Sequence, residues 1–285
     1  MLDTTSLHTL LSLLPEGARM LFAGDDAQLP RVGIGRVFHD LVSEGSRVAR
    51  LTQVRLQAAD SKIPKVASQV REGIVPELPA WGGQTEGIFI VSPDKGHAVQ
   101  RRLRAQGELL VVAALKATVI SINESESYAS RPDDAATRRL GPLATVAAGD
   151  PVVATANRYQ DGLFNGLLGV VTSIVEPNIE VLWDGEDEAR SLPKEAEGDV
   201  ELAYAITCHK AQGSSAPAVV VMVEDTPLVT REWLYTAVTR GKALVLLVAS
   251  GGSLKNAVER RTVRTTGFAL PPSRSTANPV SHLSS

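Results

Sequence analysis

Cysteine is almost absent from this chain: Cys208 is the only one among 285 residues. A single cysteine excludes an internal disulfide framework and is typical of a reducing compartment. Long apolar runs are missing as well, since no stretch approaches the roughly 18 uninterrupted apolar residues of a membrane span. The first residues also lack the basic stretch with which a signal peptide begins. We therefore expect a cytoplasmic protein without a membrane partner.

An excess of positive charge is lacking too. The net charge is -3, which counts against a protein built mainly to hold nucleic acid. Basic residues gather locally at 100–106, where they either line a groove or form the solvated face of a helix. The apolar share of 44% is that of a globular protein. The length suffices for roughly two domains of about 100 to 200 residues each.

Two motifs of nucleotide hydrolysis are missing. No G-x-x-x-x-G-K-[ST] occurs, so the chain lacks a phosphate-binding loop with its lysine. The Asp-Glu pair at 187–188 lies in an acidic turn and not at the end of an apolar strand, where it would hold Mg²⁺. His209 has no partner ligands at useful spacing, so no metal site is predicted.

The chain does contain the alternating helix and strand patterns of a parallel α/β sheet. Asp3 or Thr4 is the predicted N-cap of the first helix. Helices are predicted at 3–14, 35–44, 61–72, from 117 onward and at 231–240, the last one ended by Gly241. Strands are predicted at 18–24, 48–54, 86–93, 107–114 and 242–249, with a further strand, loop or helix, and strand over 200–223.

The pattern of apolar and turn-forming residues changes between residues 148 and 192. Short alternating apolar runs are separated there by Gly, Asn and Asp about every ten residues, which predicts a small antiparallel β module. The module interrupts the α/β pattern. From residue 271 the chain is too polar and proline-rich to fold.

Two single residues are candidates for phosphate chemistry. Gln28 follows the predicted strand 18–24 with Gly24 and Asp25, and a neutral amide at the edge of a parallel sheet can hold a water or a phosphate oxygen. The alternative is a turn-capping Asp beside an exposed Gln. Arg240 ends the predicted helix 231–240, from which its guanidinium can reach across a cleft. The alternative is an arginine that complements the helix dipole.

The stretch 207–213, TCHKAQG, places hydroxyl, imidazole, ammonium and amide groups directly after an apolar strand. A Cys208–His209 nucleophile pair is disfavoured because adjacent side chains diverge. Contacts with phosphate or nucleic acid suit this polar set better.

These segments occur together and in order, and jointly they resemble a known family. GDDAQLPRVGIG, LTQVRLQ, GDPVVATANRYQDGLFNGLLGVV, ITCHKAQGSSAPAVVV and LYTAVTRGKALVLLV look like the later motifs of RecD-like DNA helicases of superfamily one, including those of conjugative relaxases. The resemblance spans residues 2–249 and includes a UvrD-like helicase C-terminal domain. It implies RecA-like α/β domains of the P-loop NTPase type, with an SH3-like β-barrel inserted into the second.

The resemblance also implies domain limits. Residues 1–49 would be the C-terminal remainder of the first RecA-like domain. Residues 50–147 and 199–250 would form the second, residues 148–198 the inserted barrel, and residues 251–285 a disordered tail.

Site roles follow from the same resemblance. Gln28 would sense the γ-phosphate or attacking water, and Arg240 would be the arginine finger, both in catalytic roles. Tyr235, Thr236 and Thr239 would support the helix that delivers Arg240. The implied nucleotide-binding residues are Gly24, Asp25, Gln28, Arg55, Gly213 and Arg240. The implied DNA-binding residues are Thr207, His209, Lys210 and Gln212.

The sequence departs from the family pattern at three places. The missing phosphate loop and Asp-Glu motif belong upstream of a segment like residues 1–11, so Met1 is expected to be an internal methionine of a longer protein. Leu56 stands where the family carries arginine, with Arg55 one residue earlier and facing the opposite way on a strand. Ser215 stands where the family commonly carries an acid.

Three hypotheses follow. The first is the C-terminal part of an ATP-dependent DNA helicase that moves 5′ to 3′ on single-stranded DNA and serves repair, recombination or conjugation. It would use ATP and Mg²⁺ only with the missing N-terminal motor half, in cis or in trans, and would be inactive alone. The second is a non-catalytic DNA-binding or regulatory module, and the third is a truncated product without function.

Overall fold

A computed structural model describes residues 3–30, 33–45, 48–50, 62–140 and 144–262. The chain divides into two units. The described residues up to Asp26, together with those from Pro30 to Arg50, belong to one unit, while Ala27–Leu29 and the described residues from 62 to 262 belong to the other. Each unit is considered by itself.

The first unit contains helices α1 (Thr4–Leu13) and α2 (Val37–Glu44). The predicted N-cap of α1 is confirmed, because the Asp3 carboxylate accepts a hydrogen bond from the Ser6 amide at 2.7 Å. Gly24 lies against α2: a Cβ at this position would come within 3.0 Å of the Phe38 ring. A side chain larger than hydrogen is therefore excluded at Gly24 unless Phe38 moves.

The strand predicted at 18–24 is not formed, so this prediction is wrong. None of these residues is in a strand, and the Leu21 side chain is 95% exposed. A strand exists only when its N–H and C=O groups pair with a neighbour. No strand pairs with this segment in the described part of the chain. The strand predicted at 48–54 lies largely outside the described residues.

The second unit is built on a five-stranded parallel sheet in the order β1-β12-β11-β2-β10. All of its pairings are parallel, which confirms the predicted α/β class. Its strands are β1 (Gly87–Val91), β2 (Leu109–Ala113), β10 (Ile206–Thr207), β11 (Ala216–Met222) and β12 (Gly241–Val248).

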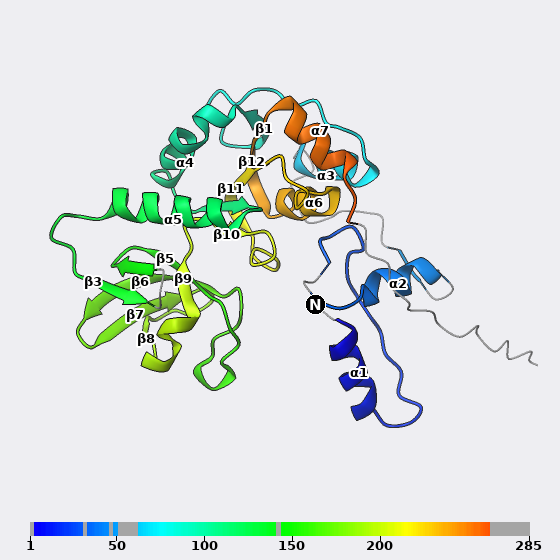
Figure 1. Cartoon of the computed structure of the whole chain (residues 1–285), viewed down its shortest axis with the longest axis horizontal. Coiled ribbons are helices and arrows are strands. Elements are labelled where there is room, and N and C mark those ends of the chain that lie inside the picture. The colour runs from blue at the N-terminus through cyan, green and yellow to red at the C-terminus, as the bar shows by residue number, and fades with distance from the viewer. Residues whose placement is uncertain (1–2, 31–32, 46–47, 51–61, 141–143, 263–285) are drawn as a thin grey trace, which may run out of the picture. The chain divides into compact units, whose positions relative to one another are not determined.

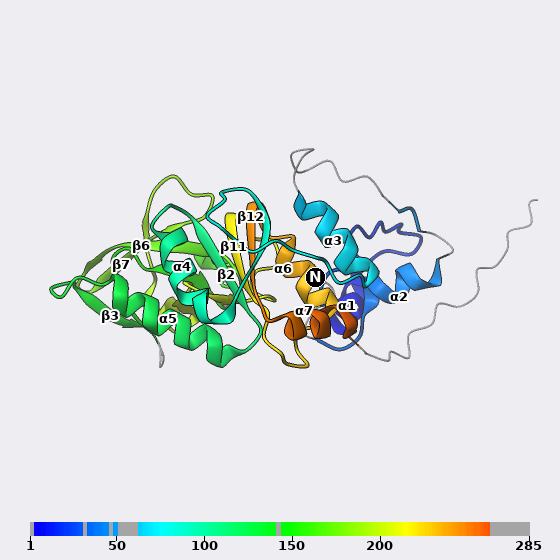
Figure 2. The same cartoon turned by 90° about the horizontal axis from the view of Figure 1, so that it is seen from above.

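Helices cover both faces of this sheet (Figure 2). Strand residues alternate between two cores: Val219 and Val221 of β11 face one cluster, whereas Val220 faces the other. Both faces are apolar because both are buried. Helices α3 (Lys62–Glu72), α6 (Arg231–Val238) and α7 (Gly251–Glu259) contribute to the first cluster, and α4 (Gly96–Arg104) and α5 (Lys116–Ser130) to the second. None of the helices in the described ranges is long and apolar enough to cross a membrane.

An antiparallel module interrupts this domain, as predicted. Its five-stranded sheet has the order β8-β7-β6-β5-β9. The strands are β5 (Pro151–Ala154), β6 (Leu168–Val175), β7 (Asn178–Trp183), β8 (Arg190–Ser191) and β9 (Val200–Leu202), with short 3-10 turns at Tyr159–Asp161 and Lys194–Asp199. Because β9 pairs with β5, the predicted end of the module at residue 198 falls one strand short.

Two strands before the module were not predicted. Strands β3 (Thr137–Leu140) and β4 (Ala144–Ala147) form an antiparallel pair, and Leu140 and Val146 are buried in the apolar core of the module. Helix α5 lies between the two sheets (Figure 1) and contacts β2 and β10 on one side and β4 on the other. This helix is therefore the main junction between the module and the parallel sheet.

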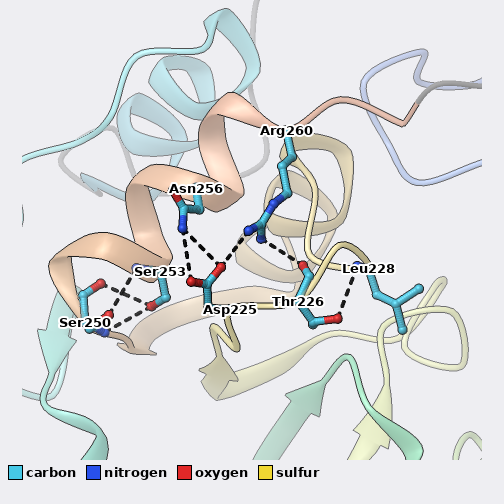
Figure 3. A network of polar contacts seen from close by, with 7 residues as sticks. All are labelled: Asp225, Thr226, Leu228, Ser250, Ser253, Asn256 and Arg260. Carbon is cyan, nitrogen blue, oxygen red and sulfur yellow. Dashed lines mark hydrogen bonds and ion pairs between the residues drawn. The ribbon is translucent and has the colours of Figure 1, made fainter.

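Helix α7 corrects the prediction that the chain is disordered from residue 251. Ser250 and Ser253 form a reciprocal capping box at its start, and Leu254, Ala257 and Val258 are buried. At its other end, Arg260 bonds Asp225 at 2.6 Å and the Thr226 carbonyl at 2.9 Å (Figure 3). Capping, burial and this ion pair order a segment whose sequence is mostly polar.

Candidate functional site

The stretch 207–213 forms a loop anchored by two buried side chains. Cys208 and Ala211 are fully buried, and the Ala211 amide bonds the Thr207 carbonyl at 3.0 Å. Because these two residues point into the core, the polar side chains between them lie at the surface of the loop. Thr207, His209, Lys210 and Gln212 are all partly exposed. The predicted DNA-binding residues are thus brought together on one loop.

A cavity of about 320 Å³ opens beside this loop, at the carboxyl ends of β2 and β10. Lys116 at the start of α5, Thr155, Thr207 and Lys210 lie on its wall, together with apolar side chains. The Lys210 ammonium lies 2.7 Å from a carboxylate oxygen of Glu201 on β9. Asn123 and two carboxylates, Glu124 and Glu201, also line the cavity. Its wall therefore offers cations and hydroxyl groups to an anionic ligand, with carboxylates that partly offset the positive charge.

The segment that carries Gln28 is fixed to the second unit by its neighbour Leu29. The Leu29 amide donates to the Thr236 hydroxyl at 2.7 Å, and the Leu29 carbonyl accepts a hydrogen bond from the Gln212 side chain at 2.6 Å. Leu29 itself is buried. Leu29, the residue after Gln28, is therefore hydrogen-bonded both to the loop 207–213 and to helix α6.

Arg240 lies just after α6, which ends at Val238, and Gly241 begins β12. Its guanidinium does not project freely from a helix end as predicted. Instead it donates to the carbonyls of Thr236 at 3.0 Å and Ser214 at 3.1 Å and to the Thr239 hydroxyl at 3.1 Å. Arg240 thus joins the end of α6 to the end of the loop 207–213. Of the predicted supporting residues, Thr236 and Thr239 contact it directly.

The remaining predicted residues are described by where each one lies. Gly24 and Asp25 belong to the first unit, and Arg55 and Leu56 lie outside the described residues. Gly213 has a positive φ of 93°, and a Cβ at this position would have no neighbouring atom within 4 Å. Its glycine is therefore needed for the conformation of the loop and not for close packing.

Sequence reasoning missed the polar contacts that hold α5 to the module and to the loop. The Asn123 side chain accepts from the Ala205 amide at 2.7 Å and donates to the Leu202 carbonyl at 2.9 Å. Asp150 accepts from the hydroxyls of Tyr204 at 2.7 Å and Ser127 at 3.1 Å. These partners are 23 to 82 residues apart, so no local pattern could have indicated them.

The start of α5 is likewise held to the parallel sheet by a polar side chain that is distant in sequence. One oxygen of Glu224, just beyond β11, accepts from the amides of Ala114 at 2.8 Å and Leu115 at 3.0 Å, and the other contacts the Thr118 hydroxyl. A carboxylate at a helix N-terminus satisfies otherwise unpaired amides. Glu224 thereby fixes the helix end that carries Lys116.

Cys208 is expected to be unreactive in the folded protein. Burial raises the pKa of its thiol to about 12, so the reactive thiolate is scarce at pH 7 to 9. We expect a thiol reagent such as dithionitrobenzoate to label Cys208 at pH 8 only after unfolding in guanidinium. Rapid labelling of the native chain would contradict the buried position.

The sequence matches known helicases along most of its length. Residues 202–248 match the family model of the UvrD-like helicase C-terminal domain, and residues 1–86 match an AAA domain. The chain is 29% identical, over 92% of its length, to the ATP-dependent RecD2 DNA helicase of Deinococcus radiodurans. Over 94% of its length it is 31% identical to the RecBCD enzyme subunit RecD of Mycolicibacterium smegmatis. These matches support a RecD-like helicase of superfamily one.

This RecD-like chain spans only part of its relatives, namely 37% of the Deinococcus protein and 52% of the Mycolicibacterium protein. A solved structure of the Pif1 helicase from Candida albicans has a similar fold, with a TM-score of 0.53 at 17% identity. That likeness covers 81% of this chain and 64% of the Pif1 chain. The parallel-sheet α/β fold thus resembles the RecA-like domains of superfamily-one helicases.

Proposed function

We propose that this chain supplies the C-terminal part of an ATP-dependent DNA helicase that moves 5′ to 3′ on single-stranded DNA. The observation that carries the proposal is the direct connection of three elements. The loop 207–213 bonds Leu29 through Gln212, and Arg240 bonds Ser214 at the end of the same loop. A shift in position at Gln28 or Arg240 can therefore be passed to Lys210 through hydrogen-bonded groups. Such a path is needed if the state of the nucleotide is to change the contact with DNA.

In this proposal the two ends of the loop have different tasks. Gln28, Gly213 and Arg240 face the nucleotide, with Gly24, Asp25 and Arg55 as further contacts. Thr207, His209, Lys210 and Gln212 meet the DNA, and the cavity beside Lys116 is the place where the strand passes. Both ends share the buried anchor residues Cys208 and Ala211, which tie them to the same core.

The residues of this chain do not by themselves fit ATP with Mg²⁺. The sequence has no phosphate loop, and the described residues contain no group of three or more His, Cys, Asp or Glu side chains that could hold a metal ion. We therefore assign this chain only the sensor and the arginine finger. The triphosphate cradle and the metal ligands belong to an N-terminal motor half, in cis or in trans.

We further propose that the antiparallel module is an SH3-like barrel and that residues 1–49 complete the first RecA-like domain. Support for the barrel comes from its own buried apolar core, in which Trp183, Val181 and Leu163 are at most 1% exposed. Support for the first-domain assignment comes from the apolar segment at 18–24, whose Leu21 is 95% exposed. A neighbouring strand from the remainder of that domain would cover it.

A non-catalytic DNA-binding module is the second candidate. Leu56 and Ser215 favour it, because they stand where the family carries an arginine and an acid. Both candidates require binding of single-stranded DNA by the loop 207–213, and only the first requires a contribution to ATP hydrolysis.

Binding of single-stranded DNA tests the shared part of both candidates. We expect Lys210→Ala to weaken binding of labelled oligothymidine and to lower the salt slope by about 0.7, the value for one lost phosphate contact on a single strand. Fluorescence anisotropy at several salt concentrations measures both quantities. The matched control is Lys255→Ala, an exposed lysine on α7 that pairs with Glu259 at 3.8 Å. Binding that is salt-independent, or equal in both variants, would overturn the assignment of Lys210.

A further inference from the structure

The antiparallel module holds Lys210 at two points. At the side chain, the Lys210 ammonium pairs with Glu201 at 2.7 Å, and Glu201 lies on β9, which pairs with Val153 of β5 in the module sheet. At the backbone, the Lys210 carbonyl lies against Gly166, where a built Cβ would approach it to 3.2 Å. Both holding residues come from the module and neither from the loop itself.

Gly166 belongs to a stretch that the proposed function leaves without a role, residues 157–169. Its φ is 94°, in the left-handed region that favours glycine. The turn is fixed on the module side: the Gly166 amide bonds the Ala154 carbonyl at 2.8 Å, and the Asn165 amide bonds the Asn157 side chain at 2.9 Å. These bonds tie the turn to the module, so a side chain added at Gly166 presses on the Lys210 carbonyl, which has to shift by a few tenths of an ångström.

Glu201 acts on the charged end of the same lysine. A carboxylate 2.7 Å from the ammonium occupies the place that a DNA phosphate would take, because both are anionic oxygen acceptors. Glu201 is exposed and Lys210 is half-buried, so a phosphate can displace the carboxylate from solvent. The pair holds the ammonium at the wall of the cavity, which both residues line, and opposes its release to DNA.

We propose that the antiparallel module is a positioning element for Lys210, acting on its backbone through Gly166 and on its ammonium through Glu201. The proposal rests on the proposed function in one respect, the contact of Lys210 with DNA. It adds that the module, and not only the loop 207–213, decides how strongly this contact forms. Gly166 fixes the position of the Lys210 backbone, and Glu201 limits the affinity of Lys210 for DNA.

The first test compares alanine substitutions at two glycines, only one of which lies against Lys210. Gly166→Ala and Gly185→Ala both place a side chain at a positive φ, 94° and 86°, but a Cβ at Gly185 has nothing within 4 Å. Both variants therefore carry similar backbone strain, and only Gly166→Ala pushes on Lys210. We expect Gly166→Ala to weaken oligothymidine binding and to lower the salt slope by about 0.7, as Lys210→Ala does. We expect Gly185→Ala to bind like the parent chain.

A double variant and a charge variant complete the test. In the Lys210→Ala background, Gly166→Ala is expected to cause no further loss, because both changes remove the same contact. Glu201→Gln is expected to tighten binding only when Lys210 is present. The control Glu188→Gln changes the net charge equally at an exposed position in the module. Urea unfolding of each variant confirms that the chain is folded.

The outcomes separate this proposal from the one on which it rests. Loss of affinity in Gly166→Ala but not in Gly185→Ala, with no additivity to Lys210→Ala, supports it. If the parent chain binds DNA through Lys210 but the two glycine variants bind equally and Glu201→Gln has no effect, the role of the module is overturned and the proposed function stands. If Lys210→Ala itself changes nothing, both are overturned.

Discussion

Arg240→Ala is expected to reduce DNA-stimulated ATP hydrolysis by about 10³ to 10⁵-fold when the chain is combined with a RecD-like motor half that contains the phosphate loop. This is the effect of removing an arginine finger, roughly 4 to 7 kcal/mol of transition-state stabilisation. The proposal gives Arg240 that role because it follows α6 directly and is held beside the loop 207–213 by its bond to Ser214. Steady-state hydrolysis with saturating oligothymidine measures the loss.

The controls separate charge, geometry and folding. Arg240→Lys keeps the charge but loses the planar fork of donors, so we expect a loss of similar size. Lys242→Ala removes an exposed cation two residues away and is expected to leave the rate unchanged. Arg240→Ala also removes the bonds to the Thr236 and Ser214 carbonyls and to the Thr239 hydroxyl, so urea unfolding of the variant checks that it is folded.

Two results would contradict this assignment. A loss of less than tenfold in folded Arg240→Ala would exclude an arginine finger and favour the non-catalytic module. Turnover by the chain alone that disappears in Arg240→Ala would show that the chain holds a complete phosphate site without the phosphate-loop sequence. The absence of turnover by the chain alone agrees with the proposal.

Asp150→Ala is expected to destabilise the chain by about 3 to 5 kcal/mol, because three donors lose a buried acceptor at about 1 to 3 kcal/mol each. Asp150 is 3% exposed and accepts from the Tyr204 hydroxyl at 2.7 Å, the Ala147 amide at 2.8 Å and the Ser127 hydroxyl at 3.1 Å. Without the carboxylate, these buried donors lose their acceptor. Urea denaturation followed by tryptophan fluorescence measures the free energy of unfolding.

The control for Asp150 is Glu188→Ala in the same module, because Glu188 is exposed and surface substitutions usually change stability by less than about 0.5 kcal/mol. Asp150→Asn retains one acceptor oxygen, and we expect a loss between those of the alanine variant and the control. A loss below about 1 kcal/mol in Asp150→Ala would mean that water or a rearranged side chain satisfies the donors.

The same network is expected to lose stability at high pH. Burial, and then the hydrogen bond to Asp150, raise the pKa of Tyr204 above its ordinary value. The neutral phenol is therefore favoured in the folded state, and its contribution to stability is complete below the unfolded pKa of about 10. The contribution is lost as pH rises from that value through the higher pKa of the folded state, so the free energy of unfolding falls in strong alkali.

Local patterns of the sequence determined most of the second unit. The spacing of Ile63, Val66 and Val70 predicted α3, and all three are buried. The apolar runs at 107–114 and 242–249 predicted β2 and β12, because a strand buried on both faces needs no polar alternation. The turn residues between 148 and 192 predicted the antiparallel module. In each case the signal lies within about ten neighbouring residues.

Predictions failed where the outcome depended on a partner. The run at 18–24 has the composition of a strand, yet it has no neighbour to pair with in the described chain. Helix α7 was predicted as disordered tail, yet a capping box and a buried apolar stripe order it. Pairing and burial are properties of two segments together, and periodicity in one segment does not reveal them.

The sequence by itself determined which chemical groups this protein offers: the glutamine at 28, the polar loop 207–213, the arginine after α6, and no phosphate loop. The tertiary structure alone decided how they are connected. It joins Gln212 to the Leu29 carbonyl across 183 positions of the chain, places Gly166 against Lys210 and buries Asp150 beneath Tyr204. The physical reason is that hydrogen bonds and close packing act over a few ångströms of space, whatever the distance along the chain.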